Sequence, residues 1–143
     1  MASIAPYLNF PGTTEEAFNF YKSVVGGEFT SLMRLGDTPD GAKLSAEDKS
    51  KIMHIGLGIC GGYIMATDAT ESMGFTHKLS EGNMMHICLS PDSEEEAKKL
   101  FDGLSAGGKV GTPLQQMFWG DIYGDFIDKF GIRWMVNYTP KKN

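Results

Sequence analysis

The sequence predicts an α+β fold in which two tandem βαβββ modules form a curved mixed sheet around a cleft, with the helices outside. Two observations predict it. Each half of the chain contains strand-like segments and one amphipathic helix that starts with acidic residues and stops at a glycine pair. The order strand, helix, three strands occurs twice in 143 residues, a length suited to one domain. We expect a single domain over residues 1–143, with an internal duplication of 1–70 and 83–143.

The first half opens with a strand over residues 4–10, followed by a helix. Thr13 or Thr14 can cap this helix, and acidic residues occupy its first turn, where the helix dipole favours them. Apolar side chains then recur at 3.6-residue spacing and give the helix one apolar face. Gly26-Gly27 ends the helix, because glycine readily adopts the left-handed conformation that closes helices.

Three further strands complete the first half. The one containing His54 alternates between apolar and other side chains, which indicates a half-buried strand with Ile55 on the core face. Cys60 and the glycines after it make a tight turn into the next strand. The expected segments are strands at 29–35, 51–59 and 63–67 and polar loops at 36–50 and 68–82.

The second half repeats this order. A strand over 83–90 leads to a helix that is capped within Pro91-Asp92-Ser93 and closed by Gly107-Gly108. Glu16-Ala17 recurs in matching register as Glu96-Ala97. This register indicates a duplication, with chance similarity of two generic amphipathic helices as the alternative. The expected strands are 109–111, 116–126 and 132–138.

Each helix covers one face of a small sheet, so the other face remains for a ligand. Alternation along the strands decides which side chains point there, and it assigns Leu8, Phe10, Trp134 and Val136 to the core instead. Trp119 and Tyr123 add aromatic surface for a planar ligand, although packing in a core or a dimer explains them equally well. The expected lining is mostly apolar, as in small-molecule pockets. The candidate ligand-binding residues are Tyr7, Asn9, His54, Met65, Thr67, His86, Trp119, Tyr123, Met135 and Asn137.

Composition excludes several classes of function. A net charge of −5 and scattered basic residues disfavour nucleic-acid binding, which needs a concentrated basic face. No apolar run approaches the roughly 20 residues of a membrane helix, and no signal peptide is recognisable. Two cysteines in such a chain indicate a reduced, cytoplasmic protein. We expect Cys88 to be a buried, inert thiol, because side chains two apart on a strand diverge too far for a Cys-His pair with His86.

An ordered set of short motifs resembles one protein family across almost the whole chain. The motifs, in chain order, are Tyr7-Leu8-Asn9-Phe10, Glu16-Ala17, Gly26-Gly27-Glu28, Met65-Ala66-Thr67-Asp68, Gly107-Gly108, Trp119-Gly120, Tyr123-Gly124-Asp125 and Asp128-Lys129-Phe130-Gly131-Ile132. By this set the chain is similar to the PhnB-like branch of the vicinal oxygen chelate (glyoxalase/bleomycin-resistance/dioxygenase) superfamily. That resemblance implies paired βαβββ modules, a U-shaped cleft and usually a homodimer.

The resemblance also implies four metal-binding positions in the cleft of the metalloenzymes. In this sequence they fall on Ala5 or Pro6, Met65, His86 and Met135, so that only the histidine matches. Thioethers are soft ligands, poorly matched to Mg²⁺, Mn²⁺ or Fe²⁺. We therefore expect no metal at these positions and no cofactor.

Relatives in this branch are often labelled methyltransferases, and the sequence argues against that activity here. The usual methyltransferase fold places a glycine-rich turn between a strand and a helix N-terminus. Here the glycine-rich stretch 56–62 leads into another strand, which is a hairpin.

Three functional hypotheses follow. The first is a binding module for a small apolar or aromatic molecule, acting as a homodimer. The second is a lyase, isomerase or dioxygenase-type enzyme that uses a relocated metal or His86 as a general base, since imidazole titrates near neutrality. A relocated metal would use His54 and His86 with Asp68 or Glu28. The third is a structural dimer without a ligand.

Overall fold

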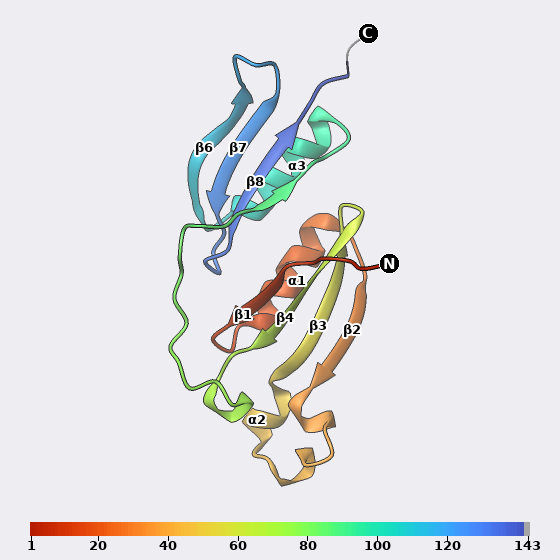
Figure 1. Cartoon of the computed structure of the whole chain (residues 1–143), viewed down its shortest axis with the longest axis vertical. Coiled ribbons are helices and arrows are strands. Elements are labelled where there is room, and N and C mark those ends of the chain that lie inside the picture. The colour runs from red at the N-terminus through yellow and green to blue at the C-terminus, as the bar shows by residue number, and fades with distance from the viewer. Residues whose placement is uncertain (142–143) are drawn as a thin grey trace. The chain divides into compact units, whose positions relative to one another are not determined.

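The computed structural model describes residues 1–141, which fall into two compact units, residues 1–80 (unit 1) and residues 81–141 (unit 2). Each unit is a four-stranded mixed sheet with a helix on one face (Figure 1). The strand orders are β1-β4-β3-β2 and β5-β8-β7-β6, so both units have the same topology. The expected pair of βαβββ modules is confirmed. No helix in the described part of the chain is long and apolar enough to cross a membrane.

In unit 1, β1 runs parallel to β4, whereas β3 is antiparallel to both of its neighbours. The loop expected at 36–50 contains a short helix, whose start is capped by Ser45 Oγ accepting from Asp48 N at 3.1 Å. The elements are β1 (Tyr7–Phe10), α1 (Thr14–Val25), β2 (Phe29–Arg34), α2 (Ala46–Ser50), β3 (Ile52–Ile59) and β4 (Gly62–Asp68), with single 3₁₀ turns at Leu35–Asp37, Gly41–Lys43 and Glu71–Met73.

Unit 2 repeats the pattern, with β5 parallel to β8 and the other pairs antiparallel. Its elements are β5 (Ile87–Leu89), α3 (Glu94–Ser105), β6 (Lys109–Gln116), β7 (Ile122–Ile127) and β8 (Arg133–Tyr138). The strand expected over 116–126 is wrong in its first part. Residues 117–120 form a turn, closed by a bond from Met117 N to the carbonyl of Asp121 at 2.7 Å.

Each core lies between the helix and one face of its sheet. Ala17, Phe18 and Tyr21 of α1 are fully buried, as are Trp134 and Val136 of β8 in the other unit. In unit 2, the Phe101 and Phe126 rings meet edge to face at 5.1 Å. Burying such side chains supplies most of the driving force for folding.

The two helices begin differently. Ser93 caps α3 as expected, accepting a hydrogen bond from Glu96 N at 3.0 Å. The expected threonine cap of α1 is wrong, because Thr13 occupies the N-cap position but its side chain makes no capping hydrogen bond. Thr14 N instead donates to Oδ1 of the buried Asp68 at 3.1 Å. A carboxylate at the end of β4 thus takes the place of a local cap.

Strand β3 departs from the expected alternation at its start. Ile52 is 1% exposed and Met53 is 38% exposed, the reverse of the predicted faces. The pairing with β2 shifts register between Met33 and Arg34, which indicates a bulge. From Ile55 onward the strand follows the predicted faces, and His54 is partly buried.

Candidate functional site

The candidate site is the sheet face turned away from the helix, which we call the distal face of each unit. In unit 1, Met65 lies at its centre, paired with Tyr7 on one side and Gly56 on the other. Tyr7 Oη lies 3.2 Å from His54 Nδ1, and their rings are 5.8 Å apart. Partial desolvation raises the pKa of Tyr7, so the phenol stays protonated at neutral pH.

Two other candidates, Asn9 and Thr67, are neighbours across the β1–β4 pairing, but their environments differ. Asn9 is exposed, whereas Thr67 is 5% exposed. The Thr67 hydroxyl donates to the carbonyl of Ile52 at 3.3 Å. The Thr67 hydroxyl is therefore already hydrogen-bonded within the unit, whereas the Asn9 amide is accessible to solvent.

The distal face of unit 2 has a matching centre. Met135 is paired with Cys88 on β5 and Asp125 on β7, the same place that Met65 takes in its own sheet. The expectation of a buried Cys88 is wrong, because this thiol is exposed. Strand β5 is an edge strand of only three residues, so little structure covers it.

Two carboxylates hold the polar side chains beside Met135. Tyr123 Oη donates to Asp125 Oδ2 at 2.8 Å, and Asn137 Nδ2 donates to Asp121 Oδ2 at 3.1 Å. Burial, followed by the bond to Asp125 and its charge, raises the pKa of Tyr123 to about 12. Neither aspartate was among the predicted site residues. Strand alternation could have found Asp125, which shares the parity of Tyr123 on β7.

Two predicted site residues lie outside the strands. His86 is exposed and directly precedes β5, which is shorter than the strand expected at 83–90. Its catalytic role stays a prediction. Trp119 is 55% exposed in the turn between β6 and β7. Its ring meets that of Phe118 edge to face at 4.9 Å, and Phe118, which was not among the predicted site residues, is 97% exposed.

The side chains at the four resemblance-derived positions do not fit a hard divalent metal. Met65 and Met135 offer only thioether sulfur at the centres of the distal faces. Within residues 1–141, no group of three or more His, Cys, Asp or Glu side chains is placed to hold a metal ion.

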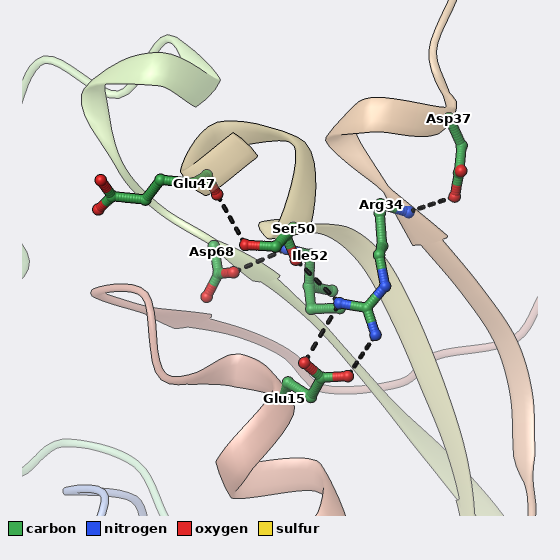
Figure 2. A network of polar contacts seen from close by, with 7 residues as sticks. All are labelled: Glu15, Arg34, Asp37, Glu47, Ser50, Ile52 and Asp68. Atoms are coloured by element: carbon green, nitrogen blue, oxygen red, sulfur yellow. Dashed lines mark hydrogen bonds and ion pairs between the residues drawn. The ribbon is translucent and has the colours of Figure 1, made fainter. Parts of the chain in front are cut away.

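In a second polar cluster, in unit 1, the polar groups form hydrogen bonds and an ion pair with one another (Figure 2). The Arg34 guanidinium donates to both carboxylate oxygens of Glu15 and, at 2.9 Å, to the carbonyl of Ser50. Arg34 N donates to Asp37 Oδ2 at 3.0 Å. This cluster joins the start of α1 to the ends of β2 and α2, which is a structural role.

Comparisons with known proteins agree with this architecture. Residues 3–136 match the family model described as Glyoxalase/Bleomycin resistance protein/Dioxygenase superfamily. Protein YjdN of Escherichia coli K12 is 33% identical over 152 aligned positions, with 97% of each chain covered. The crystal structure of PA1353 from Pseudomonas aeruginosa is 35% identical with a TM-score of 0.83, covering 99% of this chain and all of the other.

One further similar structure carries the methyltransferase label. It is a Bacillus cereus PhnB protein described as a putative 3-demethylubiquinone-9 3-methyltransferase, with 24% identity, a TM-score of 0.76 and coverage of 96% of this chain and 100% of that one. At this identity the likeness shows the fold. In the present chain, residues 56–62 run from β3 through a turn directly into β4, as the sequence predicted.

Proposed function

Because the chain belongs to the Glyoxalase/Bleomycin resistance protein/Dioxygenase superfamily, we propose that it binds a small apolar or aromatic molecule on its distal faces without a metal in the family's usual positions. The observation that carries this proposal is the matched placement of Met65 and Met135 at the centres of the two faces. Both side chains are partly buried.

The residues around these methionines suit such a ligand. Thioethers are polarisable and adapt to irregular apolar shapes. Tyr7 supplies an aromatic surface that is 45% exposed, next to the His54 ring. A few oriented polar groups amid apolar surface are typical of small-molecule sites. The proposed recognition works by shape and apolar contact.

A thermal-shift screen with planar hydrophobic compounds tests the proposal, because a ligand that binds the folded state raises the melting temperature with dose. Purified protein is compared before and after EDTA treatment, together with elemental analysis. We expect saturable stabilisation that is unchanged by EDTA and no stoichiometric metal. One Fe, Ni, Zn or Mn per chain, with stabilisation lost after chelation, would contradict the proposal.

Matched methionine variants locate the effect. Met65→Ala and Met135→Ala should weaken binding of a compound found in the screen by roughly tenfold each, the size of a lost buried side-chain contact. Met84→Ala serves as the control, because Met84 is 95% exposed before β5 and pairs with no strand. Equal effects of all three substitutions would place the ligand elsewhere.

A homodimer in the cytoplasm belongs to the same proposal. The exposed thiols of Cys60 and Cys88 suit a reducing compartment, where disulfides rarely persist. Light scattering coupled to size exclusion should give twice the 15.7 kDa of one chain. A monomer at micromolar concentration would contradict the dimer without affecting the ligand proposal.

A further inference from the structure

The hydrogen-bonding character of the unit 2 distal face bears on which ligands it accepts. Asp125 is fixed at both oxygens, since Thr112 N donates to Oδ1 at 2.9 Å and Tyr123 Oη donates to Oδ2 at 2.8 Å. A Cβ at position 111 would collide with Asp125 Oδ1, so Gly111 leaves the room that this carboxylate needs. The Tyr123 proton is thereby committed to Asp125, and its oxygen faces any ligand as an acceptor.

The side-chain amide of Asn137 is also oriented by a carboxylate, so that its oxygen remains as an acceptor for a ligand. Its Nδ2 donates to Asp121 Oδ2 at 3.1 Å, and the reversed amide would set its own oxygen against a carboxylate. Asn137 lies directly opposite Tyr123 in the β7–β8 pairing. The strip formed by Asp121, Tyr123, Asp125 and Asn137, which we call the acceptor strip, therefore presents mainly oxygen acceptors and two carboxylates.

Within residues 81–141, no Lys or Arg side chain forms an ion pair with Asp121 or Asp125. Arg133 shares the distal parity of β8 but lies beyond Met135, and its Nε donates to the carbonyl of Gly82 at 2.8 Å. Lys109 pairs with Ile127 at that same far end and is exposed. The half-exposed Trp119 lies in the turn that precedes Asp121, and an indole face attracts cations.

Resting on the proposed function, we propose that the acceptor strip selects a ligand that carries a protonated amine beside its apolar or aromatic part. An ammonium group supplies three N–H donors and a charge opposite to that of Asp121 and Asp125. A carboxylate at this place would meet like charges and acceptors without protons to share. Tyr123 and Asn137 act as specificity-determining residues, oriented by the two aspartates.

Calorimetric titration of the full chain with three indole probes tests this selection. Tryptamine is cationic, tryptophol is neutral and indolepropionate is anionic, so the apolar part is constant. We expect tryptamine to bind about tenfold more tightly than tryptophol, the effect of one charge-assisted hydrogen bond, and indolepropionate to bind most weakly. Equal binding of the three would overturn the inference and leave the proposed function standing. If none of the three binds while a compound found in the thermal-shift screen does, the inference is overturned and the proposed function stands.

Isosteric variants assign the effect to residues. Asp121→Asn should reduce tryptamine affinity about tenfold with little change for tryptophol. Asp40→Asn is the control, since this exposed aspartate in unit 1 undergoes the same charge change. An unchanged preference in Asp121→Asn would overturn the assignment.

A spectroscopic readout separates positioning from folding. Asp125→Asn keeps the side-chain volume but removes the acceptor of the Tyr123 proton. Ultraviolet titration should then show the pKa of Tyr123 falling from about 12 toward its ordinary value of 10.0, while circular dichroism stays native. A Tyr123 pKa that does not move would contradict the proposed orientation.

Discussion

Unit 1 joins its helix to its sheet through one buried carboxylate, whereas unit 2 uses a buried carboxylate to close a turn. Asp68 accepts from Thr14 N, 54 positions away, and from Ile52 N, 16 positions away. Asp128 accepts from Phe130 N, from Ile132 N and from the Trp134 indole, all within six positions. The same topology is thus held by long-range bonds in one copy and by local bonds in the other.

The largest expected effect is that of Asp68→Ala. The substitution leaves two buried backbone N–H groups without their acceptor, each at a cost of about 1–3 kcal/mol. The free energy of unfolding should therefore fall by about 3 kcal/mol. Urea denaturation measures the change, and hydrogen exchange should show lost protection at Thr14 and Ile52. Asp40→Ala, at an exposed position, is the control. A loss below about 1 kcal/mol would refute the long-range role.

Asp128→Asn should have a smaller effect, about 1–2 kcal/mol, because the carboxamide keeps one acceptor oxygen and loses the other. Either the two backbone donors or Trp134 Nε1 then lacks its partner. The change should be confined to unit 2, which Trp134 reports through its fluorescence. Loss of exchange protection in α1 would contradict the local role.

These two carboxylates show why the sequence predicted the capping contact of α3 and missed that of α1, although it placed both helix starts correctly. Ser93 caps α3 with a contact three residues away, a distance that a motif can express. The start of α1 depends on Asp68, whose position is set only when β4 pairs beside β1. Short-range sequence patterns carry no information about this contact between residues far apart in the chain.

The candidate site shows the same contrast between local features, which the sequence predicted, and contacts between side chains, which it did not. Strand alternation correctly assigned Phe10, Trp134 and Val136 to the cores, because parity is a local property. It failed at Met53, where a bulge reverses the faces, and it left the partners of Tyr123 and Asn137 unidentified. Hydrogen bonds between side chains depend on rotamers, which alternation does not specify.

The Arg34–Glu15 pair should contribute less, about 0.5 kcal/mol, because the Glu15 side chain is 47% exposed and solvent screens it. The bond from Arg34 lowers the pKa of Glu15. Its stabilisation is therefore present above the ordinary carboxyl pKa and is lost as pH falls through the lowered one. Glu15→Gln should flatten this acid dependence in urea titrations, and high salt should mimic it. A salt-independent loss would indicate packing instead.

The smallest effect at neutral pH is expected for Tyr123→Phe. Because the pKa of Tyr123 is raised to about 12, the wild-type phenol stabilises the fold below pH 10.0, and this contribution is lost as pH rises from 10.0 toward about 12. The Phe variant should lose less stability over the same range. Identical alkaline denaturation curves would contradict the partly buried contact with Asp125.

Methyl NMR of the methionines tests the central claim most directly. The nine methionine methyl signals are assigned by single substitutions, and the titrant is tryptamine added to EDTA-treated protein. The methyl groups of Met65 and Met135 should shift with saturation, while those of Met1 and Met84 should stay in place. Shifts confined to methionines off the distal faces, or binding that requires added metal, would contradict the account.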